Sequence, residues 1–320
     1  MKRKFLSTLA LLMSSSVLLI GCSSNDTSTP ATENAGATST PSNTVDSASS
    51  DSDSAETDAP TSDTTGNGVS GKVSIAGSTT VASPMEAIQE AFKEVEPNIT
   101  LEIQAVGSSA GIKAAADGTA EIGMASREVK DSERAEYGLN EIVIAKDAIA
   151  VVVHPDNPIT DLTIDQVKDL FEGTIKNWSE IGGADQDVIV ICREDGSGTR
   201  SAFEEIIGLE MDINGVTVSS VSPMAIIQEG TGAVKATTAA QEGGIGFVSL
   251  GYIDNTISAV TISGVAPTVE DTLSGAYPIS RPLLLVTQDD LSAQAQALVD
   301  YILGSDGQAV LESHNYVPVG

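Results

Sequence analysis

The stretch "DVIVICREDGSGTRSAFEEI" at residues 187–206 joins an apolar strand pattern, a glycine-rich turn and a helical pattern. The first N–H groups of a helix have no partners within the helix and carry the positive end of its dipole. Glycines and hydroxyl side chains at that end favour an anion, and Arg193 adds a positive charge where the strand ends. The stretch therefore predicts a strand, turn and helix that together form an anion site.

Two further stretches have the same order of strand, glycine with hydroxyl residues, and helix. They are "SIAGSTTVASPM" at 74–85 and "QAVGSSAGIK" at 104–113. One such turn is also what an ordinary capped helix shows, but three of them favour convergence on one small anion. In open α/β sheets ligands lie at the carboxyl ends of the strands, which is where all three turns fall.

From residue 71 onward, short apolar strands alternate with helical patterns, which predicts an α/β fold with a mixed, mainly parallel sheet. We expect strands at 71–77, 100–107, 121–126, 147–153 and 243–250, and a short helix at 110–118. The last two strands are candidates for connections that pass between two lobes. A further helix is predicted by the spacing of Met85, Ile88, Phe92 and Val95. It would begin at the capping-box pattern "SPME" at 83–86, or one turn earlier.

Residues 1–21 have the pattern of an export signal, with three basic residues before a short apolar run. The sequence "LIGC" at 19–22 resembles a bacterial lipobox, in which cleavage leaves Cys22 as a lipidated N-terminus; the alternative is an ordinary secretory signal with a chance cysteine. Residues 23–70 contain 22 Ser or Thr and 8 Asp or Glu, with no Lys, Arg or aromatic residue. We therefore expect 22–70 to be a disordered tether, and the protein to be lipid-anchored on the extracytoplasmic face of the cell membrane.

The residue inventory argues against several classes of function. A formal net charge of −29 disfavours a nucleic-acid partner. The "GSGTR" turn lacks the lysine of a nucleotide P-loop, and no spacing of His and acidic residues is typical of a metal site. His154 and His314 stand in patterns more typical of structural residues, and Cys192 ends an apolar strand as a buried residue would. We expect neither an enzyme nor a cofactor.

Six motifs resemble, in order, those of the phosphate-binding proteins of bacterial ABC phosphate importers. They are "AGSTTVASP", "VGSSAGIK", "REDGSGTR", "GGIGFVSLGY", "YPISRPLLL" and "GSDGQAVLESHNYVPV", spread over about residues 72–318. The resemblance implies a type II periplasmic-binding-protein fold, in which two crossover strands join two lobes. One lobe would comprise 71–148 and 250–320 and the other 149–249, with inorganic phosphate between them. It also implies an ABC permease as partner, and we expect a monomer.

Carried over by position, the resemblance assigns phosphate contacts to a set of turn residues. These are Thr79, Thr80, Ser109, Arg193, Ser197, Gly198 and Thr199; we add Ser126 and Arg127 as further candidates, at a place where the sequence differs from the family. It also assigns to Asp195 the role of orienting the guanidinium of Arg193. Hydroxyl groups, helix N–H groups and a guanidinium are all suitable donors to phosphate oxygens.

Arg127 departs from the family pattern. In the best-known members a buried aspartate at this place accepts the proton of hydrogen phosphate and thereby disfavours sulfate. Arg127 would be either a second phosphate-binding arginine or a surface salt-bridge partner of Glu128 or Asp131. Asp147 is another candidate acceptor. The origin of selectivity for phosphate over sulfate is therefore open at this stage.

Two other functions compete with phosphate binding. The first is binding of another tetrahedral oxyanion, such as sulfate or molybdate. The second is an adhesin or signalling lipoprotein that has the fold without the ligand. The presence of Arg193 with the complete "GSGT" turn argues against the second alternative.

Overall fold

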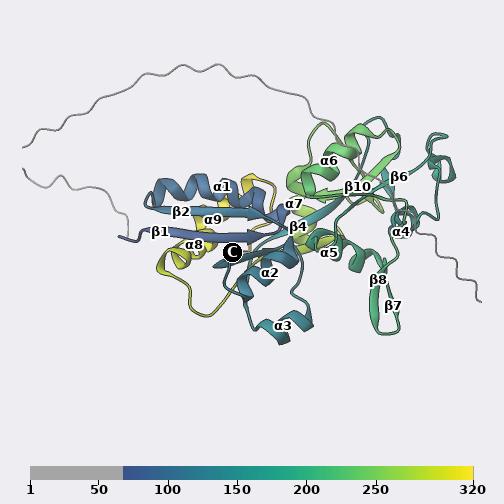
Figure 1. The fold of residues 1–320 in the computed structure, drawn as a ribbon. Coiled ribbons are helices and arrows are strands. Elements are labelled where there is room, and N and C mark those ends of the chain that lie inside the picture. The colour runs from purple at the N-terminus through teal and green to yellow at the C-terminus, as the bar shows by residue number, and fades with distance from the viewer. Residues whose placement is uncertain (1–67, 320) are drawn as a thin grey trace, which may run out of the picture. The chain divides into compact units, whose positions relative to one another are not determined.

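The computed structural model describes residues 68–319, so the expected signal sequence, Cys22 and the tether up to residue 67 lie outside the described residues. A nine-stranded sheet has the main strand order β2-β1-β3-β13-β4-β10-β6-β9, and β11 pairs with β4. Figure 1 labels β2, β1, β4, β10 and β6 of this sheet. The strands of this order are β2 (Ile99–Ala105), β1 (Gly71–Gly77), β3 (Ile122–Ala125), β13 (Ser280–Thr287), β4 (Asn140–Val153), β10 (Gly244–Ser249), β6 (Ile189–Arg193) and β9 (Ile226–Gln228).

The strand directions confirm the predicted mixed α/β sheet and show where it is parallel. Strand β1 is parallel to β2 and β3, and β6 is parallel to β10 and β9. The centre is antiparallel, because β13 runs opposite to both β3 and β4, and β10 runs opposite to β4. The parallel strands thus lie in two groups on either side of an antiparallel centre.

Helices follow β1, β2 and β6 directly, as the three turn motifs predict. The helices are α1 (Thr79–Val95), α2 (Ser108–Ala116), α3 (Asp131–Tyr137), α4 (Ile164–Glu172), α5 (Gly198–Ile207), α6 (Thr231–Ala240), α7 (Val269–Ser274), α8 (Ala293–Leu303) and α9 (Ser305–Ser313). The smaller elements are β5 (Asp161–Leu162), η1 (Trp178–Ile181), β7 (Glu210–Ile213), β8 (Val216–Ser219), η2 (Leu250–Tyr252), β11 (Ser258–Ala259) and β12 (Thr261–Ile262). Within 68–319, no helix has both the length and the apolar character needed to cross a membrane.

Helix α1 begins at Thr79, so the earlier of the two expected starts is correct. The hydroxyl of Ser78 caps it by accepting from the N–H groups of Thr80 and Val81 at 3.2 and 3.3 Å. Pro84 therefore lies inside the helix, where it has no N–H to donate, rather than at its first position. Three of the four predicted apolar positions are buried, but Val95 in the last turn is 47% exposed, so its placement on the buried face was wrong.

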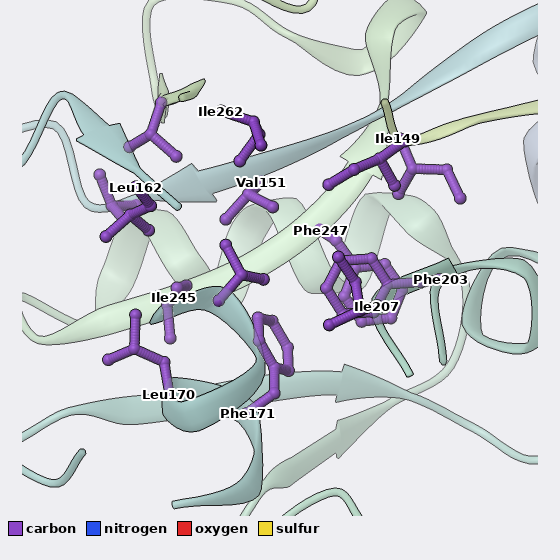
Figure 2. Close-up of a cluster of buried hydrophobic side chains, with 14 of the residues drawn as sticks. Ile149, Val151, Leu162, Leu170, Phe171, Phe203, Ile207, Ile245, Phe247 and Ile262 are labelled. Atoms are coloured by element: carbon purple, nitrogen blue, oxygen red, sulfur yellow. The ribbon is translucent and has the colours of Figure 1, made fainter. Parts of the chain in front are cut away.

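Strand β4 contributes side chains to two hydrophobic cores. Its residue Ile144 lies in a core with β1, β2, β3, α1, α8 and α9. Its residue Ile149 lies in a second core with β10, α4 and α5, shown in Figure 2. The centre of this second core is aromatic: the rings of Phe203 and Phe247 stack with centroids 4.2 Å apart, and the edge of Phe171 lies against Phe203.

The segment between β10 and β13 packs with the second core. Val260, Ile262 and Ile279 are buried in it, whereas the sequence analysis assigned all of 250–320 to the lobe that contains β1. Strand β11 supports this placement because it pairs with β4 at Val152 and Val153. The chain returns to the first core only with β13, which pairs with β4 from Asn140 to Ala148.

Candidate functional site

The turn between β6 and α5 has the predicted strand, turn and helix. Arg193 is the last residue of β6, and Gly196 adopts a left-handed φ of 84°, which glycine tolerates best. The hydroxyl of Ser197 then caps α5 by accepting from the N–H of Arg200 at 3.2 Å. The first residues of α5, Gly198 and Thr199, are buried together with Ser197. A buried helix start therefore lies directly beside a buried arginine.

Arg193 is 1% exposed and connects two other helix starts. Its Nη1 donates to Oγ1 of Thr231 and its Nη2 donates to Oγ1 of Thr79, both at 3.0 Å. Its Nε and Nη2 also donate to the carboxylate of Glu194 at 2.7 Å each. Burial acts to raise the pKa of Glu194, but the hydrogen bonds and charge of Arg193 outweigh burial and hold that pKa below its usual range. Glu194 is thus an ionised carboxylate that fixes the guanidinium.

The expected contact between Asp195 and Arg193 does not occur. The side chain of Asp195 is 98% exposed and pairs with Nη1 of Arg200 at 2.8 Å. Asp195 lies in the turn that leads into Gly196 and faces solvent, whereas the preceding carboxylate reaches back to the end of β6. The orienting carboxylate is therefore Glu194, one residue earlier.

The structure brings the first turns of four helices together. Oγ1 of Thr80 in α1 lies 2.9 Å from Oγ1 of Thr199 in α5 and 3.0 Å from Oγ1 of Thr231 in α6. The N–H of Ser109 in α2 donates to the carbonyl of Gly196 at 3.1 Å. Arg193 therefore contacts the starts of α1 and α6, Thr199 joins α5 to them, and the start of α2 lies against the turn before α5, which brings hydroxyls and the positive ends of four helix dipoles close together.

Thr231 is the residue of this group that the sequence analysis missed. It opens α6 after Gly230, which has a φ of 83°. The stretch "QEGTGAVKAT" at 228–237 has the same order of strand end, glycine with hydroxyl, and helix as the other three turns. Strand β9 is only 3 residues long, however, and so short a strand gives little apolar periodicity to detect.

Three buried serines form a hydroxyl cluster beside α1 and α2. Ser78 donates to Oγ of Ser126 at 2.9 Å, and the N–H of Ser126 donates to Oγ of Ser108 at 3.1 Å. We call Ser78, Ser108 and Ser126 the serine cluster. Gly198 lies against it so closely that a Cβ atom there would be 2.2 Å from Oγ of Ser108. Only glycine allows the start of α5 to approach the serine cluster this far.

Arg127 is 3% exposed, so its interpretation as a surface salt-bridge residue was wrong. Its two Nη atoms donate to the carboxylate of Glu133 in α3, each at 2.8 Å. Its Nη2 also donates to Oγ of Ser109 at 3.1 Å, which brings Arg127 to the start of α2. Burial acts to raise the pKa of Glu133, but hydrogen bonds from Arg127 and from the N–H of Lys130 lower it overall. The Nε of Arg127 is buried without a hydrogen-bond partner among the described residues.

The remaining reactive side chains are engaged away from the helix starts. Asp147 is buried in an ion pair with Arg281, 2.9 Å from its Nη2. Nδ1 of His154 accepts from the N–H of Asp156, and Nδ1 of His314 lies 2.8 Å from the carbonyl of Val310. Burial raises the pKa of Cys192 to about 12, so this thiol stays protonated at neutral pH. Across 68–319, no three His, Cys, Asp or Glu side chains are grouped as a metal site requires.

Comparison with known proteins identifies the family. The model of the PBP superfamily domain matches residues 54–306. The phosphate-binding protein PstS of Pseudomonas aeruginosa is 33% identical over 284 residues, which is 79% of this chain and 84% of that protein. PstS of Bacillus subtilis is 29% identical over 253 residues, 78% of this chain and 81% of that protein.

Two solved structures show the same relationship. One is a phosphate ABC transporter substrate-binding protein from Clostridium perfringens with bound phosphate; it is 42% identical, has a TM-score of 0.74, and covers 78% of this chain and 100% of its own. The other is an ABC-type phosphate transport receptor from Vibrio cholerae, 31% identical with a TM-score of 0.65, covering 77% of this chain and 100% of its own. The chain therefore belongs to the PBP superfamily and, within it, to the family of PstS phosphate-binding proteins, the substrate-binding proteins of phosphate ABC transporters.

Proposed function

We propose that this protein binds inorganic phosphate where the four helix starts meet and delivers it to an ABC permease. The observation that carries the proposal is the meeting of buried Arg193 with the first turns of α1, α5 and α6, while the start of α2 lies against the turn that precedes α5. Helix N–H groups and hydroxyls donate to oxyanion oxygens, and a guanidinium adds charge-assisted hydrogen bonds. The names of the relatives and the phosphate bound in the Clostridium perfringens structure support the same ligand.

The proposed ligands come from the turns described above. They are Thr79, Thr80, Ser109, Ser126, Arg127, Arg193, Ser197, Gly198, Thr199 and Thr231. Phosphate would exchange the contacts among the threonine hydroxyls for contacts to its own oxygens. Arg127 would contribute its positive charge and its unpaired Nε–H, because its Nη atoms already contact Glu133 and Ser109.

Sulfate is a second candidate ligand, so the selectivity of the site for phosphate over sulfate depends on which groups can accept the proton of hydrogen phosphate. The carboxylates of Glu194 and Glu133 each accept two hydrogen bonds from an arginine. Each of them also accepts from a backbone N–H, and Asp147 accepts four hydrogen bonds from Arg281, Ser249 and Leu250, so we expect hydroxyl oxygens to accept the proton of hydrogen phosphate. A site of this kind discriminates less sharply between phosphate and sulfate than one with an unpaired carboxylate.

We propose that phosphate lies between two lobes, each built around one of the two cores. The cores support a first lobe of about 71–148 and 280–319 and a second lobe of about 149–279. Hinged lobes of this kind open and close around a ligand. The protein would act as a monomer, and it would bind its ligand without turning it over, because neither histidine of the described chain contacts the converging hydroxyls.

Calorimetric titration of the purified protein tests this function. We expect one phosphate per chain, binding that is unchanged by EDTA, and a higher melting temperature with phosphate, because a ligand of the folded state stabilises it. We expect no release of phosphate from phosphate esters. Binding of sulfate or molybdate without phosphate would favour the other oxyanions. If the protein binds none of these three anions, the adhesin or signalling lipoprotein is favoured. Turnover of a phosphate ester that survives repurification would contradict the transport function.

We also propose that the protein is anchored through Cys22 on the extracytoplasmic face of the cell membrane. The support is the "LIGC" sequence at 19–22 and the polar tether that follows it. Cys22→Ala should prevent lipidation, so the precursor should stay uncleaved or the protein should appear in the soluble fraction. Cell fractionation with mass spectrometry of the N-terminus measures both. A Cys22→Ala protein that is processed and retained as the wild type is would rule out this anchor.

A further inference from the structure

Asp147 and Arg281 form a buried ion pair that the proposed ligand set does not include. They lie opposite each other on the neighbouring strands β4 and β13. Their side chains are 0% and 1% exposed, and Oδ2 of Asp147 accepts from Nη2 and Nε of Arg281 at 2.9 and 3.3 Å. Burial costs both charges their hydration, so such a pair persists only where further hydrogen bonds support it.

Those further hydrogen bonds orient the pair. Oδ1 of Asp147 accepts from Oγ of Ser249 at 2.8 Å and from the N–H of Leu250 at 3.3 Å, at the end of β10. On the other side, Nη1 of Arg281 donates to the carbonyl of Ser126 at 3.0 Å. The carboxylate therefore faces the end of β10, and the guanidinium faces the serine cluster.

Ser126 connects this pair to the helix starts. Its hydroxyl accepts from Ser78, the cap of α1, and its N–H donates to Ser108, the first residue of α2. Its carbonyl is the group that Arg281 holds, and Arg127 follows it directly in the chain. Displacement of this carbonyl would therefore shift a hydroxyl and an arginine of the site together.

We propose that Arg281 is a positioning residue of the anion site, which holds Ser126 in place through its carbonyl, and that Asp147 stabilises the buried charge of Arg281. This inference rests on the proposed phosphate function. Arg281 is also close enough to Arg193 for their charges to interact: burial lowers the pKa of Arg281 and the charge of Arg193 adds to that effect, while Asp147 opposes it.

A double-mutant cycle on phosphate affinity tests the inference. Arg281→Gln should weaken phosphate binding about tenfold in the otherwise unchanged protein. In a Ser126→Ala background it should weaken binding only about twofold, because interacting residues show non-additive effects. Asp147→Asn should lower the melting temperature yet leave phosphate affinity within about threefold, since the guanidinium still reaches the carbonyl of Ser126. Arg134→Gln, which removes an exposed arginine paired with Glu141, is the control.

A purely structural role predicts a different pattern. Arg281→Gln and Asp147→Asn would then lose affinity together and in proportion to their loss of melting temperature, and Arg281→Gln would have the same effect in both backgrounds. Either result overturns the inference. If the glutamine variant does not fold, the same cycle is run with Arg281→Lys. The loss of phosphate affinity that Arg281→Lys causes should also be smaller in the Ser126→Ala background. Wild-type protein that binds no phosphate would instead remove the proposed function, and this inference with it.

Discussion

Arg193→Ala should weaken phosphate binding by about 2 to 5 kcal/mol, the range found when one partner of a buried, hydrogen-bonded charge pair is truncated. Arg193 is the arginine whose Nη atoms contact the threonines at the starts of both α1 and α6. Its removal would also leave Glu194, whose pKa it holds below the usual range, as an unpaired carboxylate at the site. The anion then loses the attraction of Arg193 and is repelled by the carboxylate of Glu194.

Comparison with other arginine variants makes this result specific. Arg193→Lys should recover only part of the affinity, because an ammonium group cannot reproduce the planar fork of a guanidinium. Arg127→Ala should cost less than Arg193→Ala, since Arg127 contacts a single helix start through Ser109, whereas Arg193 contacts the threonines at two helix starts. Arg134→Ala, at an exposed ion pair, should have almost no effect. Calorimetry with phosphate and sulfate measures all four variants, and wild-type affinity in Arg193→Ala would remove the proposed site.

The local parts of the site could be predicted from the sequence. The turn from Arg193 to Thr199 combines a strand end, a positive-φ glycine and a helix cap within a few neighbouring residues, so it can be predicted from the local sequence. The same signal precedes Thr231, but β9 is too short to show as a strand. What the sequence does not contain is the direction of a side chain at a turn. Glu194 and Asp195 are adjacent carboxylates, and only the folded turn decides which of them faces Arg193.

Long-range pairing was the other part that sequence reasoning could not supply. Strand β13 inserts between β3 and β4, although more than 120 residues separate it from either of them along the chain. Because β13 pairs antiparallel with β4, it places Arg281 opposite Asp147 and within hydrogen-bonding distance of the carbonyl of Ser126. For the same reason the packing of Val260, Ile262 and Ile279 with the second core is not apparent from local patterns. Apolar periodicity predicts that a segment is buried but not which core receives it.

Gly198→Val should have an effect comparable with that of Arg193→Ala, by a steric route. A Cβ at residue 198 would lie 2.2 Å from Oγ and 2.8 Å from Cβ of Ser108, and 2.9 Å from Oγ of Ser126. A hydroxyl can rotate away, but the Cβ of Ser108 is fixed to the backbone at the start of α2, so α5 and α2 must separate. Overpacking of a tight contact costs about 1 to 3 kcal/mol, and the two γ-methyl groups of valine place the expected loss of binding free energy at the upper end.

The predicted loss concerns closure rather than folding, because Gly198 is the first residue of α5 and lies outside both cores. Phosphate should therefore reduce the radius of gyration of the wild type in X-ray scattering but leave that of Gly198→Val unchanged, while both proteins melt cooperatively. Gly198→Ala should show a smaller loss of affinity. Its matched control is Gly232→Ala, since Gly232 lies in the first turn of α6 and an added Cβ there meets nothing within 4 Å. Equal phosphate affinity in the two alanine variants would show that close approach of α5 to the serine cluster is not needed for binding.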